Sequence, residues 1–111
     1  MNLFTHIPAR KKPGADFALR LEDDALAPCL HRGATAYLVR SVDLSDGEVG
    51  LFYAREGLVF RQYCEDMRGT VYLFSLDRSR AQDDRMFPPG TELPVCYGKV
   101  LLAHPPELPM D

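Results

Sequence analysis

Three consecutive carboxylates, Glu22, Asp23 and Asp24, follow the alternating segment 17–21 and precede a proline-containing turn. Such carboxylates can act as general acids or bases, or can bind a hard cation. However, a run of acids at a turn is usually a solvated corner, and no histidine stands at ligand spacing beside this one. A strand that enters a sharp turn is also where hydrolases display a nucleophile. The residue at this position is Ala25, which has no group that could attack a substrate.

Short alternating segments rich in β-branched and aromatic residues predict the strands that would hold this turn. Turns containing Gly or Pro separate these segments, and we expect Gly47 to adopt the positive φ that such a corner often requires. The pattern predicts a mostly β, compact, barrel-like fold with only short helical turns. The expected strands span residues 17–21, 34–40, 48–54, 58–64, 71–76 and 93–103.

Residues 77–92 break this pattern with a polar, charged sequence that contains Pro88, Pro89 and Gly90. We expect a long loop here, with Met86 and Phe87 packing its far end onto the core. A loop of this length inside a small domain is usually mobile or functional.

The chain has 111 residues, of which 46% are hydrophobic, so we expect one core and a single domain. We divide it into a linker or N-terminal arm at 1–15, a folded domain at 16–104 and a proline-rich tail at 105–111. The formal net charge of −3 excludes a global positive field that would collect nucleic acid. Contact with DNA would therefore require residues outside this chain.

Three cysteines, Cys29, Cys64 and Cys96, lie far apart and form no CxxC pair. Their odd number and wide spacing predict reduced thiols in or near the core rather than a metal site. We expect neither a metal nor a cofactor. No apolar run reaches the roughly 20 residues of a membrane span, and the N-terminus has no apolar segment of signal-peptide length, so we expect a cytoplasmic location.

The segment 21–28, LEDDALAP, is followed by Leu30 and Gly33. It resembles the sequence around the catalytic serine of the LexA-like self-cleaving repressors, a family related to signal peptidases. In that pattern an acid, often Asp, precedes a Ser-Met pair, and Pro stands two positions after the Met. Ala25 stands at the serine. The residues at the Asp, Met and Pro positions are Asp24, Leu26 and Pro28.

Three further segments agree with this family in order and spacing. Residues 44–49 resemble the turn into its third strand, residues 58–63 the strand that carries its catalytic lysine, and residues 97–100 its closing strand. Arg61 stands at the lysine position. The resemblance covers residues 16–104 and implies a mostly β C-terminal domain. Such a domain usually follows a DNA-binding helix-turn-helix, which is not among these residues, and pairs the regulator into a homodimer.

The resemblance also implies a chain that cuts no peptide bond. A Ser-Lys dyad works because a lysine in an apolar pocket loses its proton near neutral pH and then accepts the proton of the serine hydroxyl. Ala25 supplies no hydroxyl, and Arg61 stays protonated below a pKa of roughly 12. We therefore expect the regulatory half of a transcriptional repressor. Its degenerate cleft is expected to be lined by Asp24, Leu26, Pro28 and Arg61.

The homodimer surface is expected on the closing strand, because an apolar strand near the chain terminus would be a sheet edge that needs a partner. A symmetric pair would hold two helix-turn-helix heads at the spacing of a palindromic operator. The expected contact residues are Val95, Tyr97, Val100 and Leu102.

Three alternatives stay open at this point. Arg61 could be an outward strand residue that pairs with Glu48 or Asp24 for at most about 1 kcal/mol, whereas inside the cleft it would need an acid from 22–24. The degenerate cleft could hold a peptide or a small effector without cutting it. The chain could also be an active peptidase that uses a residue not identified here.

Overall fold

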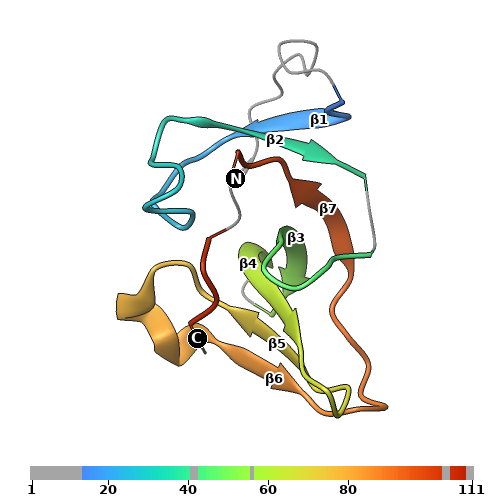
Figure 1. Cartoon of the computed structure of the whole chain (residues 1–111). Coiled ribbons are helices and arrows are strands. Elements are labelled where there is room, and N and C mark those ends of the chain that lie inside the picture. The colour runs from blue at the N-terminus through green and yellow to red at the C-terminus, as the bar shows by residue number, and fades with distance from the viewer. Residues whose placement is uncertain (1–13, 41–42, 56, 104–105, 110–111) are drawn as a thin grey trace.

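The computed structural model describes residues 14–40, 43–55, 57–103 and 106–109 (Figure 1). Most of the predicted arm, residues 1–13, lies outside this part. No helix in these ranges is both long and apolar enough to cross a membrane. The described elements are β1 (Phe17–Arg20), β2 (Thr35–Val39), β3 (Val49–Ala54), β4 (Gly57–Glu65), β5 (Val71–Phe74), the 3₁₀ helix η2 (Arg78–Asp83), β6 (Arg85–Phe87) and β7 (Cys96–Val100).

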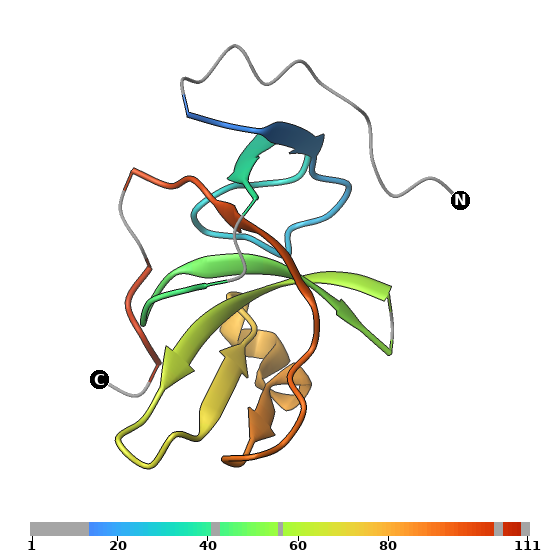
Figure 2. The ribbon, with the colours of Figure 1, turned by 90° about the vertical axis from the view of Figure 1, so that its right-hand side faces the viewer.

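All seven strands belong to one antiparallel sheet in the order β1-β2-β7-β3-β4-β5-β6, so the prediction of a mostly β fold is confirmed. β1 and β6 form the two edges of this sheet, and Figures 1 and 2 show them at opposite ends of the molecule. The sheet is therefore twisted but open. Gly47 has a φ of 89°, as expected for the turn before β3.

Alternation of side chains along β3 and β4 creates two hydrophobic clusters. The larger cluster has nine buried members, and the smaller has only three, Phe52, Val71 and Leu73. Val49 and Leu51 of β3 belong to the larger one, whereas Phe52 belongs to the smaller one. The sheet thus has a well-covered core on one side and a thin one on the other. The larger cluster includes Leu19, Leu21, Leu26, Leu38 and Val100.

The segment predicted as a loop at 77–92 contains η2 and β6 instead. The Asp77 carboxylate caps η2 by accepting a hydrogen bond of 3.0 Å from the Ser79 N–H. β6 pairs with β5, where Met86 lies opposite Tyr72. Phe87 packs against the smaller cluster as expected, but Met86 is 60% exposed and does not anchor the segment.

The cysteines differ in exposure. Cys64 is buried and Cys96 is half-buried, as expected for thiols in or near the core. Cys29 is exposed on the turn after β1, so its assignment to the core is wrong. Leu26 and Leu30, rather than Cys29, fill the core below this turn.

Glu48 connects the turn before β3 to β7. Its carboxylate accepts a hydrogen bond of 2.6 Å from the Ser45 N–H and lies 3.0 Å from Lys99 Nζ. The bond from Ser45 and, after it, the interaction with Lys99 lower the pKa of the Glu48 carboxyl from its ordinary value of 4.5. The stability that the charged Glu48 carboxylate contributes is therefore fully present above pH 4.5, and it is lost as the pH falls through the lowered pKa of this group.

We expect Glu48→Gln to reduce the free energy of unfolding at neutral pH, because the neutral amide loses the charge interaction with Lys99. The free energy of unfolding should also fall less steeply on acidification, because the amide does not titrate. Urea unfolding at a series of pH values measures both effects. Glu107→Gln, at an exposed carboxylate, is the control. If the free energy of unfolding fell with the same slope at acidic pH in Glu48→Gln and in the wild type, the role given to this carboxylate would be contradicted.

Candidate functional site

The turn at residues 21–33 joins β1 to β2 and carries the three acids. The Leu21 N–H donates to the Ala34 carbonyl and the Gly33 N–H donates to the Leu21 carbonyl, both at 2.9 Å. Gly33 has a φ of 89°, a conformation that favours glycine. Leu26 is fully buried in the larger cluster and fixes the middle of the turn. Backbone pairing and one buried leucine therefore set the position of Ala25.

Two of the acids hold the turn together. The Asp23 carboxylate accepts a hydrogen bond from the Ala25 N–H at 2.9 Å, and the Asp24 carboxylate accepts one from the Arg32 N–H at 2.8 Å. Asp24 Oδ1 also lies 3.6 Å from His31 Nδ1 at an exposed position. Within the described ranges, no group of three or more His, Cys, Asp or Glu residues is placed to hold a metal ion. We assign Asp23 and Asp24 a role in shaping the turn.

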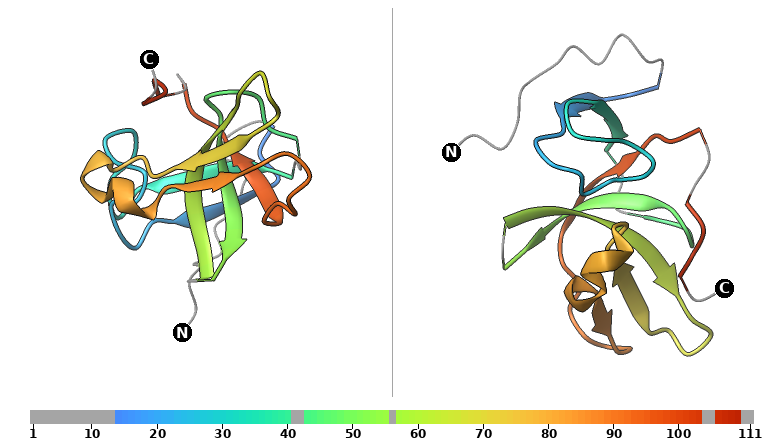
Figure 3. Two further views of the ribbon diagram at one scale, coloured as in Figure 1. Left: turned by 90° about the horizontal axis from the view of Figure 1, so that it is seen from below. Right: turned by 90° about the vertical axis from the view of Figure 1, so that its left-hand side faces the viewer.

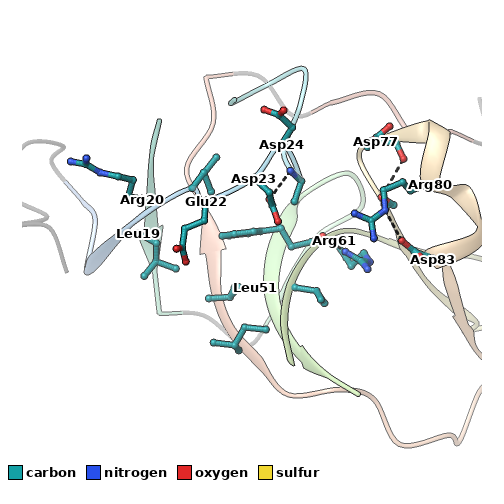
Figure 4. A pocket seen from close by; sticks show the side chains of 16 residues that line it. Leu19, Arg20, Glu22, Asp23, Asp24, Leu51, Arg61, Asp77, Arg80 and Asp83 are labelled. Atoms are coloured by element: carbon teal, nitrogen blue, oxygen red, sulfur yellow. Dashed lines mark hydrogen bonds and ion pairs between the residues drawn. The ribbon is translucent and has the colours of Figure 1, made fainter. Parts of the chain in front are cut away.

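A cavity of about 260 Å³ is lined by this turn, β4 and η2 (Figure 4). Figure 1 and the right panel of Figure 3 show the turn and η2 on the same side of the molecule. Apolar side chains of β1, β3 and β4 line part of the cavity, and three arginines, Arg20, Arg61 and Arg80, contribute to its wall. Carboxylates outnumber these arginines. They belong to Glu22, Asp23, Asp24, Asp77 and Asp83.

Ala25 and Arg61, the two positions that the resemblance pairs, line the same cavity. The Arg61 side chain extends toward η2 rather than toward the acids of the turn (Figure 4). Its Nη1 donates to the Phe60 carbonyl at 2.8 Å. On the η2 side, Arg80 Nε lies 2.9 Å from Asp83. The charge of Arg61 therefore lies on the η2 side of the cavity.

Phe60 is the residue of β4 that faces the turn. Leu58 and Phe60 pack against the larger cluster, to which Leu26 belongs, whereas Val59 packs against the smaller cluster. Side chains alternate along a strand, so Arg61 emerges on the side of Val59. A base on β4 that served residue 25 would stand at position 60, where the chain has a phenylalanine. The resemblance placed Arg61 at the lysine position, whereas the alternation along β4 directs positions 60 and 61 to opposite faces.

Of the four residues predicted to line the cleft, Asp24 and Arg61 do so. Leu26 does not, because its side chain is buried in the core beneath the turn. Pro28 is exposed and lies outside the lining as well. A helical turn, in which the Leu30 N–H donates to the Leu26 carbonyl at 3.0 Å, carries the chain away from the cavity after Ala25. The prediction is therefore wrong for Leu26 and Pro28.

The closing strand β7 is not a sheet edge, so the reason given for a dimer surface there is wrong. β7 lies between β2 and β3, with Leu38 opposite Val100 and Gly50 opposite Lys99. Val100 is only 4% exposed and belongs to the larger cluster, against which Leu102 also packs. The other two expected contacts, Val95 and Tyr97, are exposed and remain accessible to a partner.

The lining of the cavity offers little for nucleophilic catalysis. Among the lining residues that the structure describes, Ser75 is the one with a hydroxyl group, and histidine and lysine are absent. The Ser75 hydroxyl is occupied with the Asp77 carbonyl, to which it donates at 3.2 Å. Hydrogen bonds from the Ser79 hydroxyl and N–H lower the pKa of the Asp77 carboxyl, so this carboxylate stays charged at neutral pH. The charged groups of this lining are therefore carboxylates and guanidinium groups.

Comparison with known protein families, with curated proteins and with solved structures finds no match to this chain. The interpretation of the site therefore depends on the residues and their geometry.

Proposed function

We propose that the chain is a non-cleaving relative of the C-terminal domain of LexA-like repressors and acts as the regulatory and dimerisation half of a transcriptional regulator. One observation supports this proposal: Ala25, which stands at the serine position of the resemblance, lines a cavity together with Phe60 of β4, and neither side chain can act as a nucleophile or a base. The mostly β fold is compatible with it. Contact with DNA would come from a helix-turn-helix outside these residues, and such a regulator would act in the cytoplasm.

The cavity supports a second candidate function, the binding of a peptide or small effector without cleavage. Its apolar lining can hold a side chain, and its surplus of carboxylates favours a ligand with positive charge. Titration with a short lysine-rich peptide tests this candidate through the amide chemical shifts of residues 22–25 and 77–83. Unchanged shifts at both segments would exclude it for basic peptides.

Self-association through the exposed side chains of Val95, just before β7, and Tyr97, within β7, is a testable part of the first proposal. Tyr97 is 48% exposed, so Tyr97→Asp is expected to convert a dimer into a monomer by placing a carboxylate in the interface without disturbing the core. Sedimentation velocity at micromolar concentration measures the change. Met67→Asp, at a fully exposed turn residue, is the control and should stay dimeric. A wild-type chain that is strictly monomeric would contradict the dimerisation role.

A further inference from the structure

A second hollow, a groove of about 740 Å³, lies between the β3–β4 hairpin, β6 and the segment that joins β6 to β7. Figure 2 shows that segment crossing in front of the sheet with the hairpin projecting beside it. Val59, Arg61 and Asp83 border both this groove and the cavity at Ala25, and therefore separate the two.

The base of the groove is the thin side of the molecule. Phe52 and Leu73, two of the three buried members of the smaller cluster, line it together with the half-buried Phe87. A neighbouring hollow of about 400 Å³ reaches the same Phe52 and Leu73 from the other side of residues 93–95. The members of the smaller cluster are themselves buried, with Phe52 5% and Leu73 4% exposed, so the apolar area that a partner could still cover belongs to the rim of the groove.

The rim of the groove is also apolar. Three of the large hydrophobic residues that are exposed in the described part of the chain border it: Tyr53 at 59%, Leu93 at 45% and Val95 at 59%. A hydrogen bond of 3.1 Å from the Tyr53 N–H to the Val95 carbonyl holds two of them on neighbouring segments. Grouped exposed apolar side chains beside a hollow are typical of an interaction surface, whereas single ones are common on any protein.

The charged residues of the groove have the opposite balance to those of the cavity. Among the lining residues that the structure describes, Arg55 and Arg85 stand with two carboxylates, Asp83 and Glu92, and Asp83 already lies 2.9 Å from Arg80 Nε. Arg85 Nη1 donates to the Asp84 carbonyl at 3.0 Å, a bond that orients the guanidinium without cancelling its charge. The groove therefore carries a local positive surplus on a chain whose net charge is −3.

We propose that this groove binds an acidic, apolar peptide segment of a partner protein. Apolar side chains of the peptide would cover the exposed rim residues Tyr53, Leu93 and Val95, and its carboxylates would meet Arg55 and Arg85 at the edge. A second copy of this chain fits less well, because a symmetric contact would bring the same arginines face to face. A flat bilayer would not fill a concave groove.

The test uses two peptides with the same leucines, one with alternating aspartates and one with lysines in their place, added to isotope-labelled chain. With the aspartate peptide, amide shifts should change at residues 52–55, 73, 85–87 and 92–95, and the lysine peptide should bind at least tenfold more weakly. Arg85→Glu and Tyr53→Ala should each weaken binding about tenfold, since they remove a charge pair and an aromatic contact. Arg68→Glu and Met67→Ala, both at exposed positions outside the groove, are the matched controls.

Four outcomes would overturn the proposal. Two concern the peptides: equal binding of both, or amide shifts confined to residues 22–25. The third is an unchanged affinity in both groove variants. The fourth is a change of the groove signals on dilution of the chain without peptide, which would assign the groove to a second copy. Both groove substitutions are at exposed side chains, so the variants are expected to fold, and unfolding curves verify this. A failure here would leave the dimerisation test at Tyr97 unaffected, because Tyr97 does not line the groove.

Discussion

Leu26→Ala is expected to lower the free energy of unfolding by about 3 kcal/mol. Leu26 has no exposed surface and packs in the larger cluster with Leu19 and Leu21, so its truncation leaves a cavity where β1, the turn and the sheet meet. Urea unfolding followed by tyrosine fluorescence measures the loss. Because Leu26 fixes the turn, the variant should also increase hydrogen exchange at the Leu30 amide, which bonds to the Leu26 carbonyl.

Leu93→Ala is the matched control for this prediction. Leu93 is 45% exposed, so the same change of side chain should cost about 1 kcal/mol or less. A loss below about 1 kcal/mol in Leu26→Ala would mean that the turn at Ala25 is not anchored by the core. The position of Ala25 beside the cavity would then lose its physical basis.

Gln62→Leu is expected to destabilise the chain by about 2 kcal/mol, although it replaces a polar side chain by an apolar one in the interior. Gln62 is 2% exposed, and its amide donates to the Gly47 carbonyl at 3.2 Å and to the Pro106 carbonyl at 2.6 Å. Leucine leaves both carbonyls without this donor. The second bond also attaches the segment after β7 to β4, so we expect faster proteolysis near Pro106 in the variant.

Gln82→Leu, the same substitution at an exposed position of η2, serves as the control and should change stability by less than about 0.5 kcal/mol. Urea unfolding and limited proteolysis of both variants measure the two effects. An unchanged cleavage rate near Pro106, together with unchanged stability, would show that the buried amide contributes neither to the fold nor to the attachment of the C-terminal segment.

The strands from β1 to β5 were predictable because each is long enough to show its alternation or its β-branched content, as in Thr35–Val39. β6 has three residues and gives no such signal, and its position depends on pairing with β5 across η2. η2 begins at the Asp77 cap, which is a local sequence signal. The prediction of a loop at 77–92 did not take this cap into account. The placement of β7 inside the sheet results from long-range pairing with β2 and β3, which no local pattern encodes.

The candidate site, like the fold, was predictable where it depends on local residues and not where it depends on distant segments. The turn after β1 that carries Ala25 was predictable from local residues, whereas a cleft beside it was an expectation from the resemblance; in the structure Ala25 lines a cavity. Which residue of β4 faces the turn depends on the face that this strand turns toward the larger cluster, and there the structure has Phe60, whereas the resemblance had placed Arg61 at the lysine position. η2, which supplies Asp77, Arg80 and Asp83 to the cavity, was not expected at all. Residues contributed by distant segments are therefore the part that the sequence alone did not specify.

The two hollows give the chain two surfaces of opposite charge balance on either side of Val59 and Arg61. The cavity at Ala25 has a surplus of carboxylates, and the groove beside Tyr53 has a surplus of arginines. Such a separation lets each surface discriminate against ligands suited to the other, since like charges brought into contact are repelled.

The central proposal, that this chain cuts no peptide bond, is tested most directly by the intact mass of the purified chain after prolonged incubation at alkaline pH, where a lysine base would be most active. We predict a single species of unchanged mass. A pair of fragments whose masses add up to the chain plus one water would contradict the account, because it would require a working nucleophile that Ala25 and Phe60 cannot supply.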